Sequence, residues 1–312
     1  MSISRRSLML TGVAAVAGTQ TSRPAASAPK GLSKRICLFT DHLDDHGFTH
    51  AEVAKMLAQL GFAGPDLTVR SGGMVEPARA ATELPKAVET YRAAGLTVPM
   101  ITTSLQSPRS PNVREILSAA VRSGVGHFKL GYFDYPDAAQ WEARLAQVSA
   151  ELKDLLALPE GRGLVAGIHN HAGGSVGGAL WDEAELLKGL PPDRIGSYFD
   201  PAQATIEGSA HAWKLGFHRL KSRMVMLALK DFVWEKTDSG WRTRWVPLGQ
   251  GAVRWGEFFS LLAKTEFSGP VSLHIEYDPG GSNKAERADR SYAAAERDMK
   301  FLQGHLRTAG LE

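Results

Sequence analysis

The chain has 312 residues, a formal net charge of +3 and one cysteine. This length suits one large α/β domain as well as two small ones, and no linker rich in Pro, Gly or Ser divides it. Arg5, Arg6, Arg23 and Lys30 supply part of the positive charge, so the rest of the chain is close to neutral. It lacks the excess of basic residues that nucleic-acid-binding proteins have. The lone Cys37 excludes an internal disulfide, so a hydrophobic core must hold the fold.

The first residues predict an export signal. Arg5 and Arg6 stand just ahead of an apolar stretch over 8–17, which is too short to span a bilayer but suits the hydrophobic part of a signal peptide. A twin arginine at this place is typical of a Tat-type signal, and the alternative is an ordinary basic N-terminus. We therefore expect residues 1–30 to be signal peptide and disordered segment. Residues 31–312 then form a periplasmic domain with no membrane span.

Short apolar runs and helical patterns alternate along the rest of the chain. The apolar runs predict buried strands. They lie at 36–39, 65–69, 98–102, 126–130, 164–168, 195–199, 225–229 and 270–275. The amphipathic patterns between them predict helices. They lie at 51–60, 84–94, 113–122, 137–156, 182–187, 210–220, 255–264 and 285–306.

Strict alternation of about eight such units predicts a parallel sheet, and its simplest closed form is a single (β/α)8 TIM barrel. A doubly wound open sheet is the alternative. It is disfavoured because Thr-Asp-His-Leu at 40–43 follows the first strand, where a dinucleotide-binding sheet has Gly-x-Gly-x-x-Gly. The predicted barrel has its functional residues at the carboxyl ends of the strands.

Polar and ionisable residues end or follow most of the predicted strands. They are Asp41, His42, Arg70, Thr103, Ser104, Lys129, His169, His171, Asp200, Lys230 and Glu276. Packing alone does not select so many charges, because a buried charge needs a partner. Side chains two residues apart share one face of a strand, which pairs His169 with His171 and Ala228 with Lys230. The sequence therefore predicts a cluster of ionisable groups at one rim of the barrel.

Four short strings lie in order at successive strand ends: LGFAGPDL at 60–67, FDP at 199–201, LKD at 229–231 and IE at 275–276. Together they resemble the signatures of the xylose-isomerase-like TIM barrels of AP endonuclease 2 type. This superfamily holds sugar isomerases, epimerases and inosose dehydratases, and also endonuclease IV. The resemblance covers essentially the whole chain after the signal and does not indicate one substrate.

The resemblance implies a divalent metal ion, Mn²⁺ or else Fe²⁺, Zn²⁺ or Co²⁺, held by residues of strands five to eight. The family's strand-five Glu falls on His169, its strand-six Asp on Asp200 and its strand-eight Glu on Glu276. The strand-seven His falls on Ala228, so one expected ligand is missing. One His and two carboxylates still form an acceptable set for these ions.

The missing ligand leaves two arrangements open. In the first, His171 or His274 supplies the missing nitrogen. In the second, metal affinity is lost and the ammonium of Lys230, one layer above Ala228, balances the two carboxylates and polarises a carbonyl.

Either cation, the metal ion or the Lys230 ammonium, would stabilise the enediolate that forms when a proton is removed next to a carbonyl. The predicted reaction is therefore proton abstraction from a small sugar or cyclitol-like substrate. The predicted catalytic residues are Glu276, His171 and Lys230. Glu276 and His169 are the first candidates for the base, and His171 takes this role if His169 is a metal ligand, since an ordinary histidine pKa lies near neutral pH.

Four residues are predicted to contact the substrate. Lys129 and Arg70 suit the recognition of hydroxyl or carboxylate groups, although a surface salt bridge is an equal explanation for Arg70. His42 follows the first strand. Trp234 belongs to the segment 233–251, which alternates as a hairpin does and is either a lid over the sugar or a solvent-facing ribbon.

Three classes of function remain open at this point. The first is the isomerase, epimerase or lyase described above, as a monomer or a homo-oligomer. The second is a non-catalytic sugar-binding or pseudo-enzyme subunit with a degraded metal site, which the substitution at Ala228 favours. The third is a phosphodiesterase like endonuclease IV, which needs more metal ligands and a more basic surface than this chain has.

Overall fold

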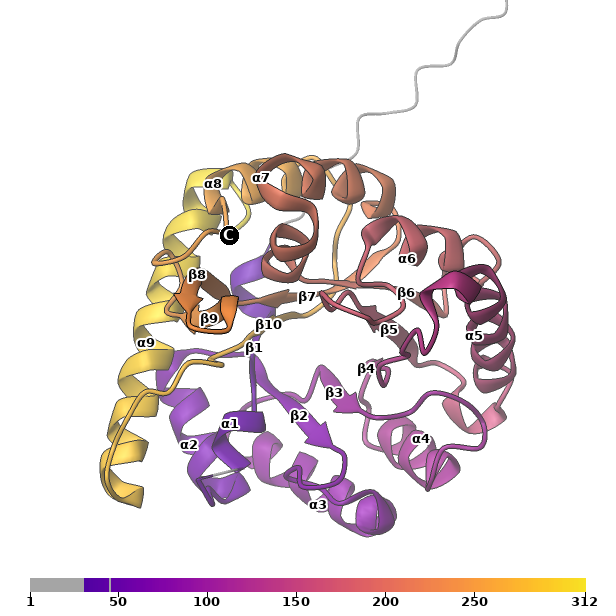
Figure 1. Cartoon of the computed structure of the whole chain (residues 1–312). Coiled ribbons are helices and arrows are strands. Elements are labelled where there is room, and N and C mark those ends of the chain that lie inside the picture. Colours follow the sequence, from indigo (N-terminus) through magenta and orange to yellow (C-terminus); the bar gives the residue numbers. More distant parts are fainter. Residues whose placement is uncertain (1–30, 45) are drawn as a thin grey trace, which may run out of the picture.

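A computed structural model describes residues 31–44 and 46–312. Parallel strands close into a barrel in the order β1-β10-β7-β6-β5-β4-β3-β2, which confirms the predicted (β/α)8 barrel and excludes the open sheet (Figure 1). The barrel strands are β1 (Ile36–Phe39), β2 (Gly64–Val69), β3 (Met100–Thr103), β4 (His127–Lys129), β5 (Val165–His169), β6 (Ile195–Phe199), β7 (Met224–Leu229) and β10 (Val271–Leu273). The predicted export signal lies outside the described residues.

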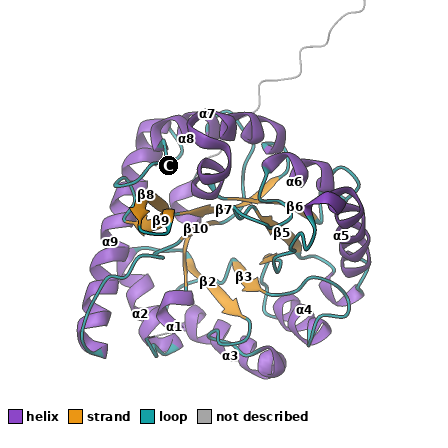
Figure 2. Cartoon of the chain, viewed as in Figure 1, coloured by secondary structure: helices purple, strands orange, loops and turns teal. Residues whose placement is uncertain are grey.

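Helices surround the barrel on all sides (Figure 2). They are α1 (Asp41–Asp44), α2 (His50–Leu60), α3 (Ala80–Ala93), α4 (Val113–Arg122), α5 (Trp141–Leu156), α6 (Leu180–Leu187), α7 (Pro201–Leu220), α8 (Trp255–Leu262) and α9 (Lys284–Ala309). Short 3₁₀ turns lie at Leu32–Arg35, Pro77–Arg79, Ala138–Gln140 and Pro159–Gly161. No helix in the part of the chain that the structure describes is both long and apolar enough to cross a membrane.

Local sequence signals set the ends of α2. Thr49 and Glu52 form a capping box, in which each side chain accepts from the other residue's backbone N–H. Gly61 ends the helix with φ 75°, a left-handed conformation that glycine adopts without steric cost. The chain then enters β2, whose residues are buried throughout.

Two sets of buried side chains hold the barrel. The larger set fills the space between the strands and the helix ring. A smaller set lies inside the barrel and consists of Cys37, Met100, Tyr198, Met226 and Ala228. This inner layer closes the barrel below the carboxyl rim, so a ligand has access only above it.

Helix α7 begins at Pro201, well before the start that the apolar pattern predicted at residue 210. The reason is the N-cap, because Oδ1 of Asp200 accepts from the backbone N–H groups of Ala202 and Gln203, and Pro201 suits the first helical position. The helix is kinked at Ser209, where φ is 56°. The cap fixes the Asp200 carboxylate at the end of β6, where the barrel has its rim.

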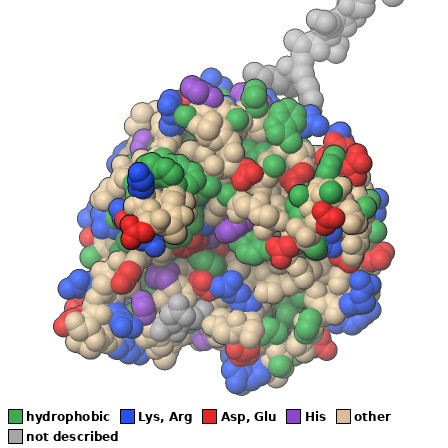
Figure 3. All heavy atoms as spheres, in the orientation of Figure 1, with side chains coloured by type: hydrophobic (Ala, Val, Ile, Leu, Met, Phe, Trp, Pro, Cys, Tyr) green, Lys and Arg blue, Asp and Glu red, His purple; other side chains and the backbone are tan. Residues whose placement is uncertain are grey.

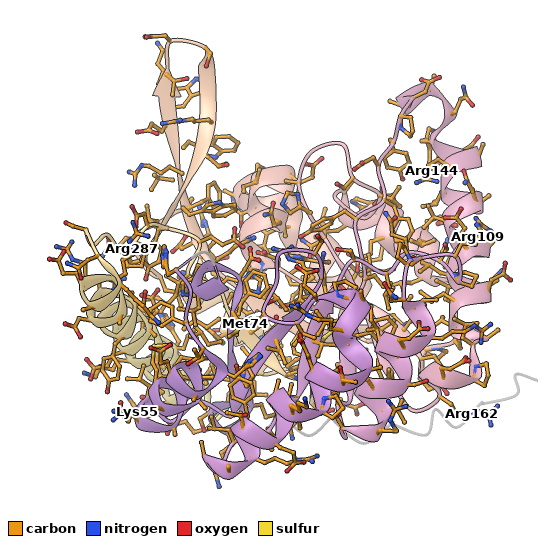
Figure 4. All side chains as sticks on the ribbon, turned by 90° about the horizontal axis from the view of Figure 1, so that it is seen from below. Lys55, Met74, Arg109, Arg144, Arg162 and Arg287 are labelled. Atoms are coloured by element: carbon orange, nitrogen blue, oxygen red, sulfur yellow. The ribbon has the colours of Figure 1, made fainter. Side chains whose placement is uncertain are left out.

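The two strands outside the barrel, β8 (Asp231–Thr237) and β9 (Gly240–Val246), form the hairpin that the alternating pattern predicted. Figure 4 shows this hairpin rising beyond the barrel. Its base is held by Asp231, which is 1% exposed. The Asp231 carboxylate accepts hydrogen bonds from four backbone N–H groups and from Nε1 of Trp255.

Candidate active site

A cavity of about 170 Å³ opens at the carboxyl end of the barrel. Side chains from every barrel strand, or from the residues just after it, form its wall. They are Phe39, Asp41, Arg70, Thr102, Lys129, Tyr132, His169, His171, Tyr198, Lys230, His274 and Glu276. Histidine and charged side chains lie near the middle of this face in the surface view (Figure 3). The rim thus collects ionisable groups around one space, as the alternation of strands and helices predicted.

The ammonium of Lys230 lies at the centre of the charge network. Its Nζ donates to Oε1 of Glu276 at 2.8 Å, lies 3.4 Å from Oδ2 of Asp200 and is 4.5 Å from the centroid of the Trp245 ring. Its side chain is 3% exposed. Burial alone would lower the pKa of Lys230, but the two carboxylates outweigh burial and hold the pKa above its ordinary value. Lys230 is therefore a cation at neutral pH.

The same ion pairs keep both carboxylates ionised. Burial favours the protonated form of Glu276 and of Asp200, but the charge of Lys230 and the hydrogen bonds to each carboxylate together outweigh burial and lower the pKa of each carboxyl. Oε1 of Glu276 accepts from Lys230 and lies 3.1 Å from Nδ1 of His274. Because the Glu276 side chain is 28% exposed, its second oxygen remains available to a ligand.

The position of Asp200 is fixed by the backbone around it. Besides capping α7, Asp200 exchanges two hydrogen bonds with Asn170: its N–H donates to Oδ1 of Asn170, and its carbonyl oxygen accepts from Nδ2 of Asn170. Both residues are fully buried. This pairing connects the ends of β5 and β6 and directs Oδ2 of Asp200 at His169 and Lys230.

His169 is neutral, and both its ring nitrogens have partners. Nε2 lies 3.1 Å from Oδ2 of Asp200, and Nδ1 lies 3.0 Å from the hydroxyl of Tyr132. An ionised carboxylate only accepts, so Nε2 carries the proton and Nδ1 accepts from Tyr132. Burial lowers the pKa of His169 to about 3, although Asp200 opposes this shift. His169 thus orients its neighbours and has no free lone pair.

His171 has the free lone pair that His169 lacks. Its Nδ1 is 3.1 Å from the carbonyl oxygen of Ala172. A carbonyl only accepts, so Nδ1 carries the proton and Nε2 of the neutral ring is unprotonated. Burial, followed by the charge of Lys230, lowers the pKa of His171, which keeps the ring neutral at physiological pH. The ring lines the cavity and packs 4.9 Å from the Tyr132 ring.

Beneath the cavity, a chain of hydrogen bonds connects the rim with the barrel interior. The hydroxyl of Tyr198 lies 3.0 Å from Nε2 of His274 and 3.1 Å from Oδ2 of Asp66. Asp66 also accepts from the hydroxyls of Thr102 and Ser272, both at 2.8 Å. Burial raises the pKa of Asp66. These hydrogen bonds give the buried polar groups at the cavity floor their partners, and they hold His274 next to Glu276.

The other side of the cavity carries Lys129 and Arg70. The Lys129 side chain is directed over the ring of Tyr132, with Nζ 3.5 Å from the ring centroid. Burial, followed by the nearby charge of Arg70, lowers the pKa of Lys129 to about 7. Arg70 itself forms an ion pair with Asp41.

The cavity wall contains most of the predicted site residues, and three of them, Asp200, His42 and Trp234, do not line it. Both ring nitrogens of His42 are buried and have no hydrogen-bond partner among the residues that the structure describes. Burial lowers the pKa of His42 to about 3, so the ring is neutral. Trp234 lies on the hairpin, is 49% exposed and packs edge-on against Phe232, while Trp245 is the hairpin residue beside Lys230.

Sequence reasoning missed Tyr132 and Asp66. Tyr132 lies beyond the end of β4, in a segment without strand or helix periodicity, so no pattern placed its ring beneath Lys129. Asp66 lies within the apolar run of β2, and its charge there was a signal, because an acidic residue inside a buried strand must find partners in the interior.

Two of the three predicted metal ligands, Asp200 and Glu276, flank a cation, but this cation is Lys230, and the third, His169, is hydrogen-bonded to Asp200. His169 directs a proton rather than a lone pair at Asp200, and Ala228 offers no donor atom from β7. In the described part of the chain, no group of three or more His, Cys, Asp or Glu side chains could hold a metal ion. These side chains, as arranged, do not fit a divalent ion.

Comparisons with known proteins agree with this fold. Residues 54–303 match the sequence family described as "Xylose isomerase-like TIM barrel". A search of curated protein sequences found no match.

Solved structures with this fold include the D-allulose 3-epimerase from Methylomonas sp., at 13% identity and TM-score 0.64, covering 90% of this chain and 100% of that chain. The 3-keto-D-glucoside 4-epimerase from E. coli has 14% identity and TM-score 0.60, covering 84% and 98%. A xylose isomerase-like TIM barrel protein from Mycobacterium smegmatis, solved in complex with magnesium, has 14% identity and TM-score 0.60, covering 88% and 97%. At these identities the similarity shows the fold alone.

Proposed function

Because this chain belongs to the xylose isomerase-like TIM barrel family, we propose that it is a sugar isomerase or epimerase, or a lyase, that removes a proton next to a carbonyl. Its substrate is a small sugar or cyclitol-like ketone or aldehyde. The observation that carries this proposal is the pairing of a fixed cation, Lys230, with an unprotonated ring nitrogen on His171 in the wall of one cavity. Similarity of fold to two sugar epimerases supports the same class of reaction.

Lys230 has the role of electrophile. Its ammonium is held by Glu276 and Asp200, so it is in position before the substrate arrives and needs no reorganisation when charge develops on the substrate oxygen. The carbonyl oxygen accepts a hydrogen bond from Nζ, and the enediolate charge forms against it. The free oxygen of Glu276 accepts from a neighbouring substrate hydroxyl, which orients the carbonyl.

His171 has the role of base. Nε2 takes the proton from the carbon next to the carbonyl, and the imidazolium that results returns it to the same or the neighbouring carbon. Return to the former carbonyl carbon gives isomerisation once a proton has moved between the two oxygens of the enediolate. Loss of a β-hydroxyl as water, with the imidazolium proton, gives elimination. Epimerisation needs the proton on the opposite face of the carbon, so the enediolate must turn in the cavity before His171 returns it. The carbonyl of Ala172 stabilises the imidazolium by accepting from Nδ1.

The test is solvent deuterium uptake. The purified full-length chain is incubated in D₂O with a panel of ketoses, aldoses, keto-glycosides and inososes, and exchange at carbon is followed by NMR. We expect exchange with at least one compound, and a loss of about a hundredfold or more in His171→Gln. Lys264→Met, which changes an exposed lysine, is the control. Wild-type protein that exchanges no compound in the panel contradicts the proposed reaction and favours a non-catalytic sugar-binding subunit.

The proposed cation is tested by metal content. Protein purified without chelator is expected to contain well under about half an equivalent of any transition metal, because Lys230 has the position between the carboxylates. A full equivalent of Mn, Fe, Zn or Co that survives dialysis, and whose removal abolishes exchange, overturns the role of Lys230 and restores the metal site implied by the resemblance.

Periplasmic residence remains part of the proposal. A fusion of residues 1–40 to a folded reporter is expected to reach the periplasm only while Arg5 and Arg6 are intact. A reporter that stays in the cytoplasm contradicts it.

A further inference from the structure

The cavity contains one buried cation that has no carboxylate partner. Arg70 is paired with Asp41, and Lys230 with Glu276 and Asp200. Lys129 is only 4% exposed and makes neither an ion pair nor a side-chain hydrogen bond within residues 31–44 and 46–312; its recorded contact is with the Tyr132 ring. When it is protonated, the Lys129 ammonium therefore has no opposite charge paired with it in the free protein, which agrees with its pKa being lowered to about 7.

An unbalanced buried ammonium is costly for the fold. Lysine is rarely buried without a paired charge, because the desolvation of the ammonium must be offset by hydrogen bonds or an opposite charge. The ring of Tyr132 offsets part of this penalty through a cation–π contact. Among the residues that the structure describes, the Tyr132 ring is the one recorded contact of the ammonium, so packing alone does not account for its place in the cavity wall.

The position of Lys129 matches a second anchor point for the substrate. In the barrel order, β5 and β6 separate β4, which carries Lys129, from β7, which precedes Lys230. The two ammonium groups therefore stand on different sides of the cavity, with His169 and His171 between them along the rim. A substrate whose carbonyl is held by Lys230 has another part near Lys129.

We propose that the substrate is a sugar acid whose carboxylate is bound by Lys129, with Arg70 beside it. This inference rests on the proposed function for the identity of the reacting end, and it adds the class of substrate. One unpaired ammonium matches the single negative charge of a carboxylate, whereas a phosphate dianion calls for at least two free donors of positive charge. The carboxylate replaces the missing partner of Lys129 and restores charge balance in the cavity.

The test uses two unreactive probes that differ only at one end. D-Gluconate carries the carboxylate and D-glucitol has a hydroxymethyl group in its place, and neither has a carbonyl that turnover could consume. Binding of each to the full-length chain is measured by calorimetry, with glucitol 6-phosphate as the phosphate probe. We expect gluconate to bind at least about tenfold more tightly than glucitol, because a charged hydrogen bond is added in a buried site.

Lys129→Met is the decisive variant. It is expected to weaken gluconate binding at least about tenfold and to leave glucitol binding unchanged. Its melting temperature is expected to equal or exceed that of the wild type, because an unpaired buried ammonium is replaced by an apolar chain of similar length. The matched control is Lys264→Met, which makes the same change at an exposed site and should leave both affinities unchanged. Lys129→Arg keeps the charge and is expected to keep part of the preference for gluconate.

Several outcomes overturn the proposal. They are equal binding of gluconate and glucitol by the wild type, undiminished gluconate binding by Lys129→Met, and a preference for glucitol 6-phosphate that depends on Lys129. A strong drop in the melting temperature of Lys129→Met would assign a structural role instead. Deuterium exchange confined to neutral sugars overturns the sugar-acid inference and leaves the proposed reaction intact. Gluconate binding that depends on Lys129, without any exchange, supports the inference and contradicts the reaction.

Discussion

At the scale of single residues, the ion pairs of Lys230 with Asp200 and Glu276 distinguish this site from the metal centre that the resemblance implies. The Lys230 ammonium lies within reach of both Asp200 and Glu276; Lys230 and Asp200 are buried, and the Glu276 side chain is 28% exposed. Ala228, one layer below, offers no nitrogen where the family string has a histidine. Lys230 thus supplies a cation two residues after Ala228, the position at which the family's histidine is lost.

Removal of the Lys230 charge is predicted to affect both activity and stability. Lys230→Met leaves the fully buried Asp200 and the partly exposed Glu276 without a cation. We therefore expect exchange to fall at least about a hundredfold and the free energy of unfolding to fall by about 3 kcal/mol or more. Lys230→Arg keeps the charge and should lose less stability. Deuterium exchange and urea unfolding measure the two effects. Full exchange activity in Lys230→Met would show that another group polarises the carbonyl.

At the scale of elements, the hairpin β8–β9 depends on one carboxylate at its base. Asp231 collects five donors from β8, from the segment after β9 and from Trp255 at the start of α8. This arrangement fixes the direction in which β8 leaves β7 and keeps Trp245 over Lys230. The hairpin thus positions one wall of the candidate site, while its far end, with Trp234 and Trp241, is exposed.

Loss of the Asp231 carboxylate is predicted to destabilise the fold strongly. Asp231→Ala leaves several buried N–H groups without an acceptor, so we expect the free energy of unfolding to fall by about 3 kcal/mol or more. Glu235→Ala, in the same strand, removes only exposed ion pairs with Arg242 and Arg244, and should cost less than about 1 kcal/mol. Urea unfolding of both variants makes the comparison. Equal losses would mean that Asp231 does not anchor the hairpin.

At the scale of the whole molecule, one buried acid is predicted to make stability depend on pH. Glu183 on α6 is fully buried, and neither carboxyl oxygen has a hydrogen-bond partner among the described side chains and backbone groups. Burial raises the pKa of Glu183 from 4.5 to about 8. The unfolded chain releases this proton near pH 4.5 and the folded barrel keeps it until about pH 8. As pH rises through this window, Glu183 therefore favours the unfolded state.

Glu183→Gln removes the titrating group and should reduce this dependence. The free energy of unfolding is measured for both proteins at pH 5 and at pH 8. From pH 5 to pH 8, the stability of the variant relative to the wild type is expected to rise by about 3 kcal/mol. Glu185→Gln, an exposed site on the same helix, should show almost no such change. A wild-type to variant difference that is the same at both pH values would contradict the assignment.

Much of the architecture was predictable because it depends on local patterns. Runs such as 36–39 and 195–199 were located to the residue, since a strand buried on both faces is a continuous apolar run. The start of α7 was misplaced, because the apolar pattern begins only after the first turns and the capping role of Asp200 depends on geometry. The gathering of Lys129, His171, Lys230 and Glu276 at one rim followed from the fold class, because all parallel strands end there.

The sequence by itself determined the alternation of strands and helices, the family and the identity of the ionisable groups at the strand ends. Only the tertiary structure decided how these groups pair. Lys230 lies between Asp200 and Glu276, while Lys129 is left with the Tyr132 ring. The physical reason is that periodicity specifies the face and the end on which a side chain lies, whereas charge pairing depends on distances of a few ångströms between strands far apart in the chain.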